Sequence, residues 1–515
     1  MGFAWSPNFD FGGGRFRDGR TVVRGGFGIA YDPGFFNIVL NTVTAAPFAA
    51  AGTVNQVPGG PGSVTFPFLP STTAELNLTP GTNGGDPRLF NQTRVDPDLY
   101  NPYTLQFNFG IQQEMWKNSV LEVRYVGSRI VGQFQTMNGN PNVQWLNRAA
   151  QCLGMDPGAF SHGNVVGTPA ASADDACSGL GFNNRPGTNG NGRIDPNFGN
   201  VRTRINGASA TYHGLQTRFD TRFRNDMVLN ANYTWSRTID NASEIFSTFG
   251  GGSTVAHSQD PFDITSGERG LSAFHQKHNF TANFIYSFPW MRDQQGVTGH
   301  VLGGWQLSGI VRLASGRAYT PINFLATYDP AWENGFIGSG ALRPFNGNPN
   351  APDGTIAVGN FSAQNLIGGT VTDSPTGFWI YNTLSPGSQP QPGTLNDARL
   401  VYNDFGLFSQ FGVPLDFAES FQHFRTPFGD VGRNTFFGLP FYGLNLAVFK
   451  TTNITENVKV EFRAEAANIL NRRNFGVPDP ITEDAYLGGA VGSFQNPGWN
   501  NGSQRELRLG LRFIF

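Results

Sequence analysis

Apolar and polar residues alternate strictly along many segments of this chain. In residues 103–114, every second position from Leu105 to Ile111 is apolar, and the positions between them are polar or glycine. Successive side chains of a β-strand point to opposite faces, so the pattern predicts a strand with one apolar face and one polar face. A helix would scatter the same residues around its axis.

The same alternation predicts eleven strands. Several of them run for ten to twelve residues, whereas strands of soluble proteins average about 5–6. About nine to eleven residues of a tilted strand cross the hydrocarbon core of a bilayer. The predicted strands are residues 1–6, 21–31, 103–114, 119–130, 210–223, 227–238, 277–288, 302–314, 440–450, 457–468 and 504–515.

Short and long connections between these strands alternate along the chain. Outer-membrane barrels have tight periplasmic turns and long extracellular loops. Structureless loops of such length argue against a compact soluble domain. The sequence therefore predicts an all-β fold, an antiparallel transmembrane outer-membrane β-barrel located in the cell outer membrane. The short or medium connections are 115–119, 224–226, 289–301 and 451–456, and the long ones are 32–102, 131–209, 239–276, 315–440 and 469–503.

The amino-acid composition narrows the possible classes of protein further. Charged residues make up 14% of the 515 residues, against about 25% in soluble domains, and 47 phenylalanines raise the aromatic share to 13%. No segment approaches the ~18 consecutive apolar residues of a membrane helix, which excludes helical membrane proteins. The formal net charge of −2, from 35 basic and 37 acidic residues, gives no electrostatic reason to expect nucleic acid as a partner.

Charged side chains fall on the polar face of the predicted strands. An Arg or Lys facing lipid at the midplane would cost about 2–4 kcal/mol, so these residues are expected to face the lumen. There they would stiffen the wall and hold a plug or, alternatively, contact a passing substrate. The residues are Glu122, Arg124, Arg218, Asp220, Arg222, Lys459, Glu461, Arg463, Glu465, Arg508 and Arg512.

Aromatic residues lie near the predicted strand ends, namely Trp116, Trp235, Trp290, Tyr125 and Tyr286. Membrane proteins concentrate Trp and Tyr at the boundary between lipid and water. These side chains are therefore predicted to form interfacial girdles.

No catalytic or metal-binding constellation can be assembled. His275 and His278 form a His-x-x-His pair where a strand begins, but no third ligand stands at a fixed spacing, so an interfacial polar pair is the better interpretation. The glycine runs 12–14 and 250–252 are followed by no helical pattern and do not predict a phosphate site. The sequence predicts no enzyme and no cofactor.

Residues 189–195 faintly resemble a calcium-binding loop. The first-position acid is missing, because Gly187 stands there, and the twelfth-position acid is replaced by Phe198. A turn cluster of Gly and Asn explains the segment better.

The two cysteines, Cys152 and Cys177, both lie in a Gly- and Ser-rich stretch. A disulfide between them would suit an extracytoplasmic setting, and two free thiols fit the sequence equally well.

The N-terminal residues contain neither a basic n-region nor an apolar h-region, so no secretory signal is predicted. If the last strand ends in the periplasm, an odd strand count places the N-terminus outside the cell. Bacterial single-chain barrels have even strand numbers. We therefore expect residues 1–515 to be the C-terminal piece of a longer barrel.

Several motifs resemble the Oar-like family of TonB-dependent receptors. The ending Glu506–Phe515 also resembles the terminal strand that the barrel-assembly machinery recognises, with Leu509, Leu511, Phe513 and Phe515 as its apolar and aromatic positions. The motifs are TVVRGGFGIAYD at 21–32, LEVRYVGSR at 121–129, YHGLQ at 212–216, YTWSRTIDNAS at 233–243, GWQLSG at 304–309, GRN at 432–434 and FRAEAANILNRRNF at 462–475.

This resemblance implies a twenty-two-stranded barrel of which the chain is the C-terminal half. The family's plug, TonB box and N-terminal domain have no counterpart in these residues, so contact with the TonB complex would pass through that missing plug region. The expected function is energy-coupled uptake of a large solute such as a siderophore, glycan or peptide. The alternative is Oar-type surface adhesion or an export-linked role. Outer-membrane lipid and the assembly machinery are the other expected partners.

Overall fold

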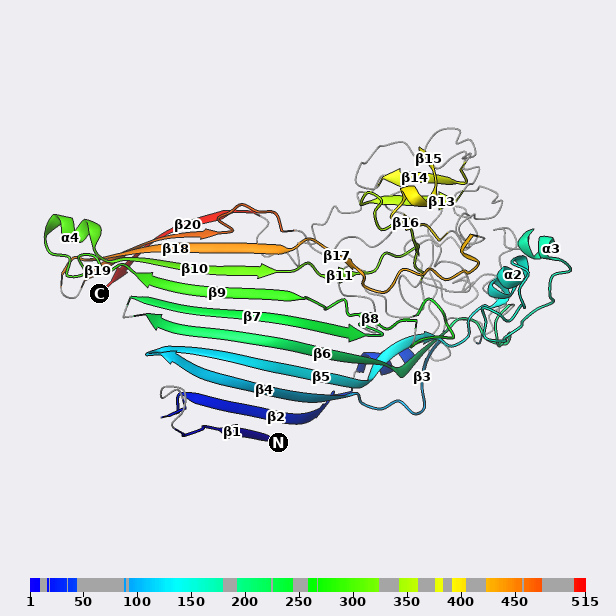
Figure 1. Cartoon of the computed structure of the whole chain (residues 1–515), viewed down its shortest axis with the longest axis horizontal. Coiled ribbons are helices and arrows are strands. Elements are labelled where there is room, and N and C mark those ends of the chain that lie inside the picture. Colours follow the sequence, from blue (N-terminus) through cyan, green and yellow to red (C-terminus); the bar gives the residue numbers. More distant parts are fainter. Residues whose placement is uncertain are drawn as a thin grey trace, which may run out of the picture.

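A computed structural model gives the architecture of the chain (Figure 1). It describes residues 1–9, 16–17, 19–34, 36–43, 88, 92–178, 192–223, 226–243, 258–265, 267–323, 342–359, 376–382, 391–403, 423–455, 458–474 and 504–515.

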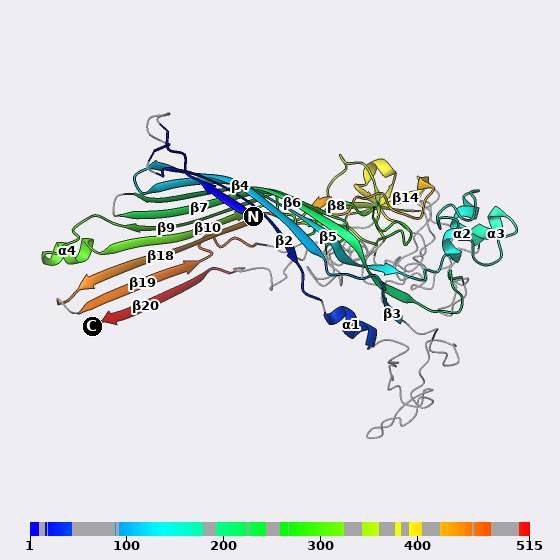
Figure 2. The ribbon, with the colours of Figure 1, turned by 90° about the horizontal axis from the view of Figure 1, so that it is seen from below.

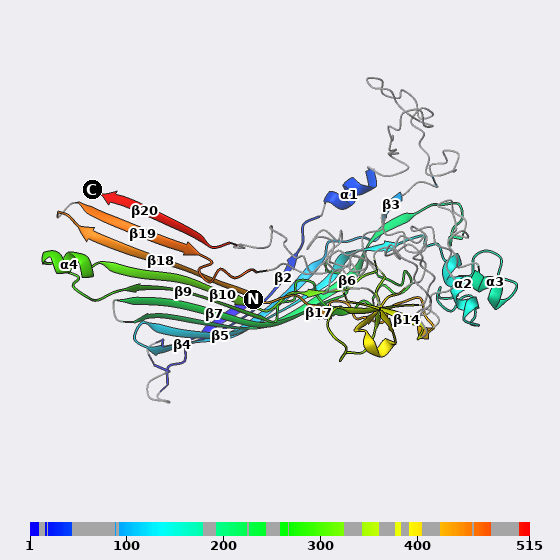
Figure 3. The same ribbon diagram turned by 90° about the horizontal axis from the view of Figure 1, so that it is seen from above.

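Eleven antiparallel strands, hydrogen-bonded in chain order, form one large twisted sheet with β1 and β20 at its two edges (Figures 1 and 3). The eleven predicted strands are thereby confirmed. Two short strands join the sheet from the side: β3 (Gln92–Val95) runs parallel to β6, and β8 (Gly270–Leu271) pairs with β7. The eleven strands are β1 (Gly2–Trp5), β2 (Thr21–Tyr31), β4 (Tyr103–Trp116), β5 (Ser119–Asn138), β6 (Val201–Phe223), β7 (Met227–Asp240), β9 (His278–Ser287), β10 (Trp305–Ala314), β18 (Phe441–Asn453), β19 (Lys459–Ala467) and β20 (Glu506–Ile514).

The register keeps like residues together on each face of this sheet. Val23, Ile111 and Val123 lie opposite one another on three successive strands. In the eleven strands of the large sheet, the Phe, Tyr, Trp, Leu and Ile side chains are exposed or half-buried, and Phe462 is 40% exposed. The large apolar residues of the sheet thus form an open apolar face and do not pack into a dry core.

Tight connections gather at one end of the sheet. Asn118, with a φ of 63°, takes the left-handed conformation in the turn between β4 and β5. Between β9 and β10 the chain forms helix α4 (Gly296–Leu302), so the predicted strand start at residue 302 was wrong and β10 begins at Trp305. Gly304 links the two with a φ of 74°, and a Cβ there would collide with the carbonyl of Thr451.

At the opposite end, β5 and β6 continue well past their predicted limits into a projecting hairpin (Figure 2). The prediction of one irregular loop over residues 131–209 was therefore wrong at both margins. The projection carries helices α2 (Gln144–Cys152) and α3 (Ala173–Ser178), which a disulfide between Cys152 and Cys177 connects with a Cα–Cα distance of 4.7 Å. Helix α1 (Phe36–Val43) lies at the same end.

The long segment 315–440, predicted as a loop, contains two small sheets. One pairs β11 (Ala318–Tyr319) with β17 (Phe436–Phe437). The other has five strands around a buried core that includes Phe345, Ala357 and Val401. Its elements are β12 (Phe345–Asn346), β13 (Thr355–Gly359), β14 (Phe378–Asn382), β15 (Gln391–Gly393), β16 (Leu400–Val401) and the 3-10 turn η5 (Leu395–Asp397).

Within the described ranges, the helices are all too short or too polar to be membrane spans.

The disulfide offers a local test of the projection. Replacing Cys152 and Cys177 together by Ser releases a loop with a sequence separation of 25 residues, and a cross-link of that size stabilises by about 3 kcal/mol. We expect faster backbone hydrogen exchange over α2 and α3 and unchanged exchange in β7 and β9. Equal exchange in both proteins would show that packing alone holds the two helices.

Candidate functional site

All eleven charged residues singled out in the sequence lie on one face of the large sheet, which we call the charged face. Glu122 stands opposite Arg218, and Arg124 opposite Gln216, in the register of β5 and β6. The alternation then passes without a change of face through β7, β9, β10 and β18 to β19 and β20. The register thus joins residues up to 390 positions apart (512 − 122) into one surface.

The first group of charges sits on β5 and β6. Arg218 Nε lies 2.6 Å from Asp220 Oδ2, and Arg124 Nη1 lies 4.0 Å from Glu122 Oε1. Arg124 also donates to Gln216 Oε1 across the strands at 2.8 Å. These side chains are half-buried or exposed, and Arg222 continues the row toward the tight-turn end.

The second group sits on β19 and β20. Arg463 Nε donates to Glu461 Oε1 at 2.6 Å, and Arg508 Nε donates to Glu506 Oε1 at 2.7 Å. Glu461 stands opposite Arg512, and Glu465 stands opposite Arg508. Lys459 lies between Asn453 and Ile514.

The direct ion pairs described in both groups run along a strand, between residues two positions apart. Side chains at positions i and i+2 of a strand point to the same face. On an exposed surface they are free to bend toward one another and form an ion pair. The cross-strand contacts at these positions are made by amides instead, as with Gln216 and Asn230.

Between the two groups, the charged face carries amide side chains that form hydrogen bonds across strands. Asn230 donates to Asp220 Oδ1 at 2.6 Å, and Asn283 donates to Asn230 Oδ1 at 3.3 Å. Arg312 of β10 also lies on this face between the two groups and was not among the predicted residues. Its guanidinium lies 5.2 Å from the ring centre of Phe441 on the same face. The charged face therefore carries charged groups on β5–β6 and β19–β20, with amide side chains and an Arg–Phe contact on the strands between them.

Beyond the long-loop end of the charged face lies a buried polar cluster that we call the anchor network. Arg433 forms an ion pair with Asp240 at the end of β7, and its Nε donates to the Glu268 carbonyl at 2.8 Å. Both side chains of this ion pair are at most 4% exposed. Next to it, Asn434 exchanges hydrogen bonds with Thr320, at 2.8 and 3.0 Å.

A second ion pair extends the anchor network toward the small five-stranded sheet. Arg343 Nη1 lies 2.7 Å from Glu268 Oε2, with exposures of 4% and 1%. Glu268 Oε1 accepts from Ser258 Oγ at 3.1 Å and from the Gln259 amide at 3.2 Å. The network thus fixes the segments around β8, β12 and β17 to the end of the large sheet.

The sequence quoted the motif GRN at 432–434 only for its family likeness and assigned no role to Arg433. Asn434, with a φ of 56°, takes the left-handed turn conformation that Asn tolerates, but this marks a turn and assigns no role to Arg433. Its partner Asp240 is 193 positions away and has no local mark.

The four residues of the predicted assembly signal lie on the edge strand β20 and at the residue after it. Leu509, Leu511 and Phe513 are 76%, 60% and 55% exposed on the apolar face, and Phe515 is 91% exposed. Leu511 continues the apolar row through Phe462, which is directly opposite on β19.

The two histidines of the His-x-x-His pair serve different neighbours. His275 is buried and accepts from the Thr238 amide at 3.3 Å, whereas His278 Nδ1 lies 2.8 Å from Tyr233 Oη. In the described part of the chain, no group of three His, Cys, Asp or Glu side chains has metal-site geometry. Residues 189–191 of the calcium-like segment and both glycine runs lie outside the described residues.

Comparison with known proteins identifies the fold family. A family model described as an outer membrane beta barrel domain matches residues 1–508. A search of curated protein sequences finds no match.

Among solved structures, the chain is similar to the outer membrane transporter YddB from Escherichia coli, with 10% identity, a TM-score of 0.36, and coverage of 97% of this chain and 38% of that one. It is also similar to the FrpB iron transporter from Neisseria meningitidis, with 8% identity, a TM-score of 0.33, and coverage of 100% and 38%. The ferripyoverdine receptor of the outer membrane of Pseudomonas aeruginosa gives 8% identity, a TM-score of 0.34, and coverage of 96% and 31%. The chain spans less than two fifths of the length of these structures.

Proposed function

Because this chain belongs to the family of outer membrane beta barrel domains, we propose that its charged face lines the aqueous lumen of a barrel that takes up a large solute in an energy-coupled manner. The protein resides in the cell outer membrane. The observation that carries the proposal is the continuous charged face, because eleven ionisable side chains on one side of a membrane-length sheet need water.

The apolar face supports this orientation. Its exposed rows include Ile111 at 44% and Phe109 at 49%, which suit contact with acyl chains. Trp116 and Trp290, 52% and 60% exposed, lie at the tight-turn end, and Trp235 lies toward the long-loop end. These positions fit aromatic girdles at the two boundaries of the lipid core.

The folded loops support a receptor role. The anchor network attaches the small five-stranded sheet to the long-loop end, which faces the outside in barrels of this kind. A rigidly held loop surface above a polar lumen can select a solute before it enters. We propose a siderophore, glycan or peptide as the solute class.

Coupling to the TonB complex is part of the proposal and rests on the Oar-like motifs. A plug region supplied by the rest of a longer barrel would contact the charged face and transmit the pull of TonB. The charged groups on β5–β6 and β19–β20 would hold that plug, and folding in the cell would use the barrel-assembly machinery through β20.

Uptake is testable with the full-length protein in its own cells. Cells with and without the gene receive fluorescent ferric siderophores, oligosaccharides and peptides that are too large for porins, with or without a protonophore. We expect one class to accumulate in the periplasm only when the gene is present and the proton-motive force intact. Accumulation of no class would contradict the proposal.

Surface adhesion is the second candidate, favoured by the disulfide-linked helices α2 and α3 at the tip of the projecting hairpin. Deleting residues 139–200 tests it in the same cells. Loss of attachment to surfaces, with no class of solute accumulating in the intact strain, would favour adhesion over uptake.

A further inference from the structure

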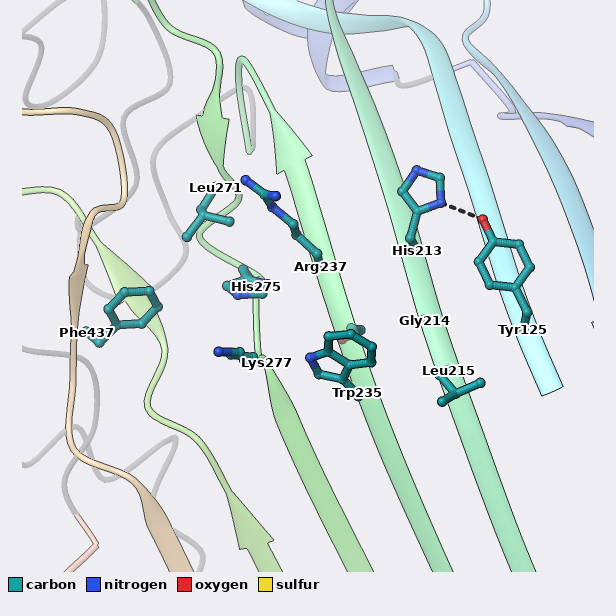
Figure 4. A pocket seen from close by; sticks show the side chains of 11 residues that line it. Tyr125, His213, Gly214, Leu215, Trp235, Arg237, Leu271, His275, Lys277 and Phe437 are labelled. Atoms are coloured by element: carbon teal, nitrogen blue, oxygen red, sulfur yellow. Dashed lines mark hydrogen bonds between the residues drawn. The ribbon is translucent and has the colours of Figure 1, made fainter. Parts of the chain in front are cut away.

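A cavity of about 590 Å³ opens on the apolar face where β5, β6 and β7 approach the long-loop end, beside β8 and β17 (Figure 4). We call it the rim groove. Its apolar lining includes Tyr125, Leu215, Trp235 and Phe437. Its basic lining consists of His213, Arg237, His275 and Lys277.

Strand geometry gives the depth of the rim groove. His213 is ten residues from the tight-turn end of β6 at Phe223 (223 − 213), and Arg237 is ten residues from the start of β7 at Met227 (237 − 227). Ten residues at about 3.4 Å each, tilted by about 40°, rise by roughly 25 Å. This is the height of the apolar band of such barrels, so the groove sits at the outer boundary of the lipid core.

The lining divides into an apolar and a cationic part along the strands. Leu215 and Trp235, 38% and 52% exposed, stand opposite one another through the register and lie nearer the middle of the sheet. Arg237 and His213, also opposite one another, lie one step closer to the long-loop end. A molecule filling both parts must therefore combine an apolar body with a group that binds cations.

The positively charged side chains of the rim groove lie close together and are free to bind an anion. Burial, together with the positive charges of Arg237 and Lys277, lowers the pKa of His275. Arg237 and Lys277 are both exposed and form no ion pair among the residues that the structure describes. Tyr125 Oη lies 2.6 Å from His213 Nδ1, which fixes that imidazole at the groove wall. The site attracts an anion and repels a cation.

We infer that the rim groove binds a phosphorylated lipid of the outer leaflet, with its phosphate between Arg237 and Lys277 and its first acyl carbons against Trp235 and Leu215. This rests on the orientation given under the proposed function, in which the apolar face meets lipid. Free phosphate would use only the cationic part, whereas a lipid at this depth uses both. Cations at a membrane surface each add to the affinity for anionic headgroups.

The test uses the purified full-length protein in neutral detergent and measures bound phosphatidic acid by native mass spectrometry. We expect saturable binding of phosphatidic acid, weak binding of the neutral lipid phosphatidylcholine, and no competition by millimolar inorganic phosphate. The double variant Arg237→Gln, Lys277→Gln should bind about 30-fold more weakly, as expected for two membrane-surface cations. Arg237→Lys should retain most of the affinity.

The matched control is Arg20→Gln with Lys117→Gln, which removes the same charge at the tight-turn end. Heat-modifiable migration on gels confirms that each variant is folded. Unchanged affinity in the rim-groove variant, equal loss in the control, or displacement of the lipid by inorganic phosphate would each overturn the inference. Lipid binding is measured without any solute, so failure of uptake leaves this result independent.

Discussion

Replacing Val311 by Arg is expected to lower the free energy of unfolding by about 2–4 kcal/mol, the cost of a cation facing lipid near the midplane. Val311 lies on the apolar face opposite Ala282 and Leu444, six residues from the start of β10 at Trp305 (311 − 305). The measurement is urea unfolding of the full-length protein in lipid vesicles, followed by tryptophan fluorescence.

The neighbouring residue is the matched control. Ile310 is also aliphatic and β-branched, but it is 55% exposed on the charged face between Asn283 and Asn445. Ile310→Arg should change the free energy of unfolding by no more than about 0.5 kcal/mol, as surface substitutions do. Equal costs at the two positions, or a larger cost at Ile310, would refute the assignment of the faces to lipid and lumen.

Replacing Arg433 by Met is expected to destabilise the anchor network by about 3–5 kcal/mol. The variant keeps the side-chain volume but leaves the buried Asp240 carboxylate without its cation. Because the network connects loops to an intact sheet, the loss should appear as local unfolding. Backbone hydrogen exchange should therefore accelerate near Leu271 and Thr320 while the middle of β7 stays protected.

Two further variants separate the charge from the packing. Adding Asp240→Leu to Arg433→Met removes the uncompensated carboxylate and should recover most of the lost stability. Arg399→Met breaks the exposed ion pair with Asp353, whose carboxylate is 80% exposed, and should cost no more than about 1 kcal/mol. An Arg433→Met variant with unchanged exchange would show that the anchor network holds nothing in place.

The strands of the large sheet were predictable because their signal is local. In β7, every second residue from Met227 to Trp235 is apolar, and β7 ends within two residues of the prediction. The signal failed where bulges interrupt it. Register shifts between Val131 and Gln135 exchange the two faces of β5, so the alternation ends while the pairing continues to Asn138.

The charged face could be assembled only in part. Which residues share it followed from alternation, but the pairing of Asp220 with Asn230, and of Arg312 with Phe441, depends on side chains of neighbouring strands meeting in register. The rim groove could not be predicted from the sequence for the same reason. Its basic residues Arg237 and Lys277 stand on separate segments, and Phe437 reaches it from β17.

The sequence by itself determined the repeat of the strands, their two faces and the alternation of short and long connections, because these depend on neighbours a few positions apart. Only the tertiary structure decided which distant groups meet, as Arg433 and Asp240 do across 193 positions. Such pairs leave no periodic trace along the chain, since burial and opposite charge select them only once the loops have closed over the end of the sheet.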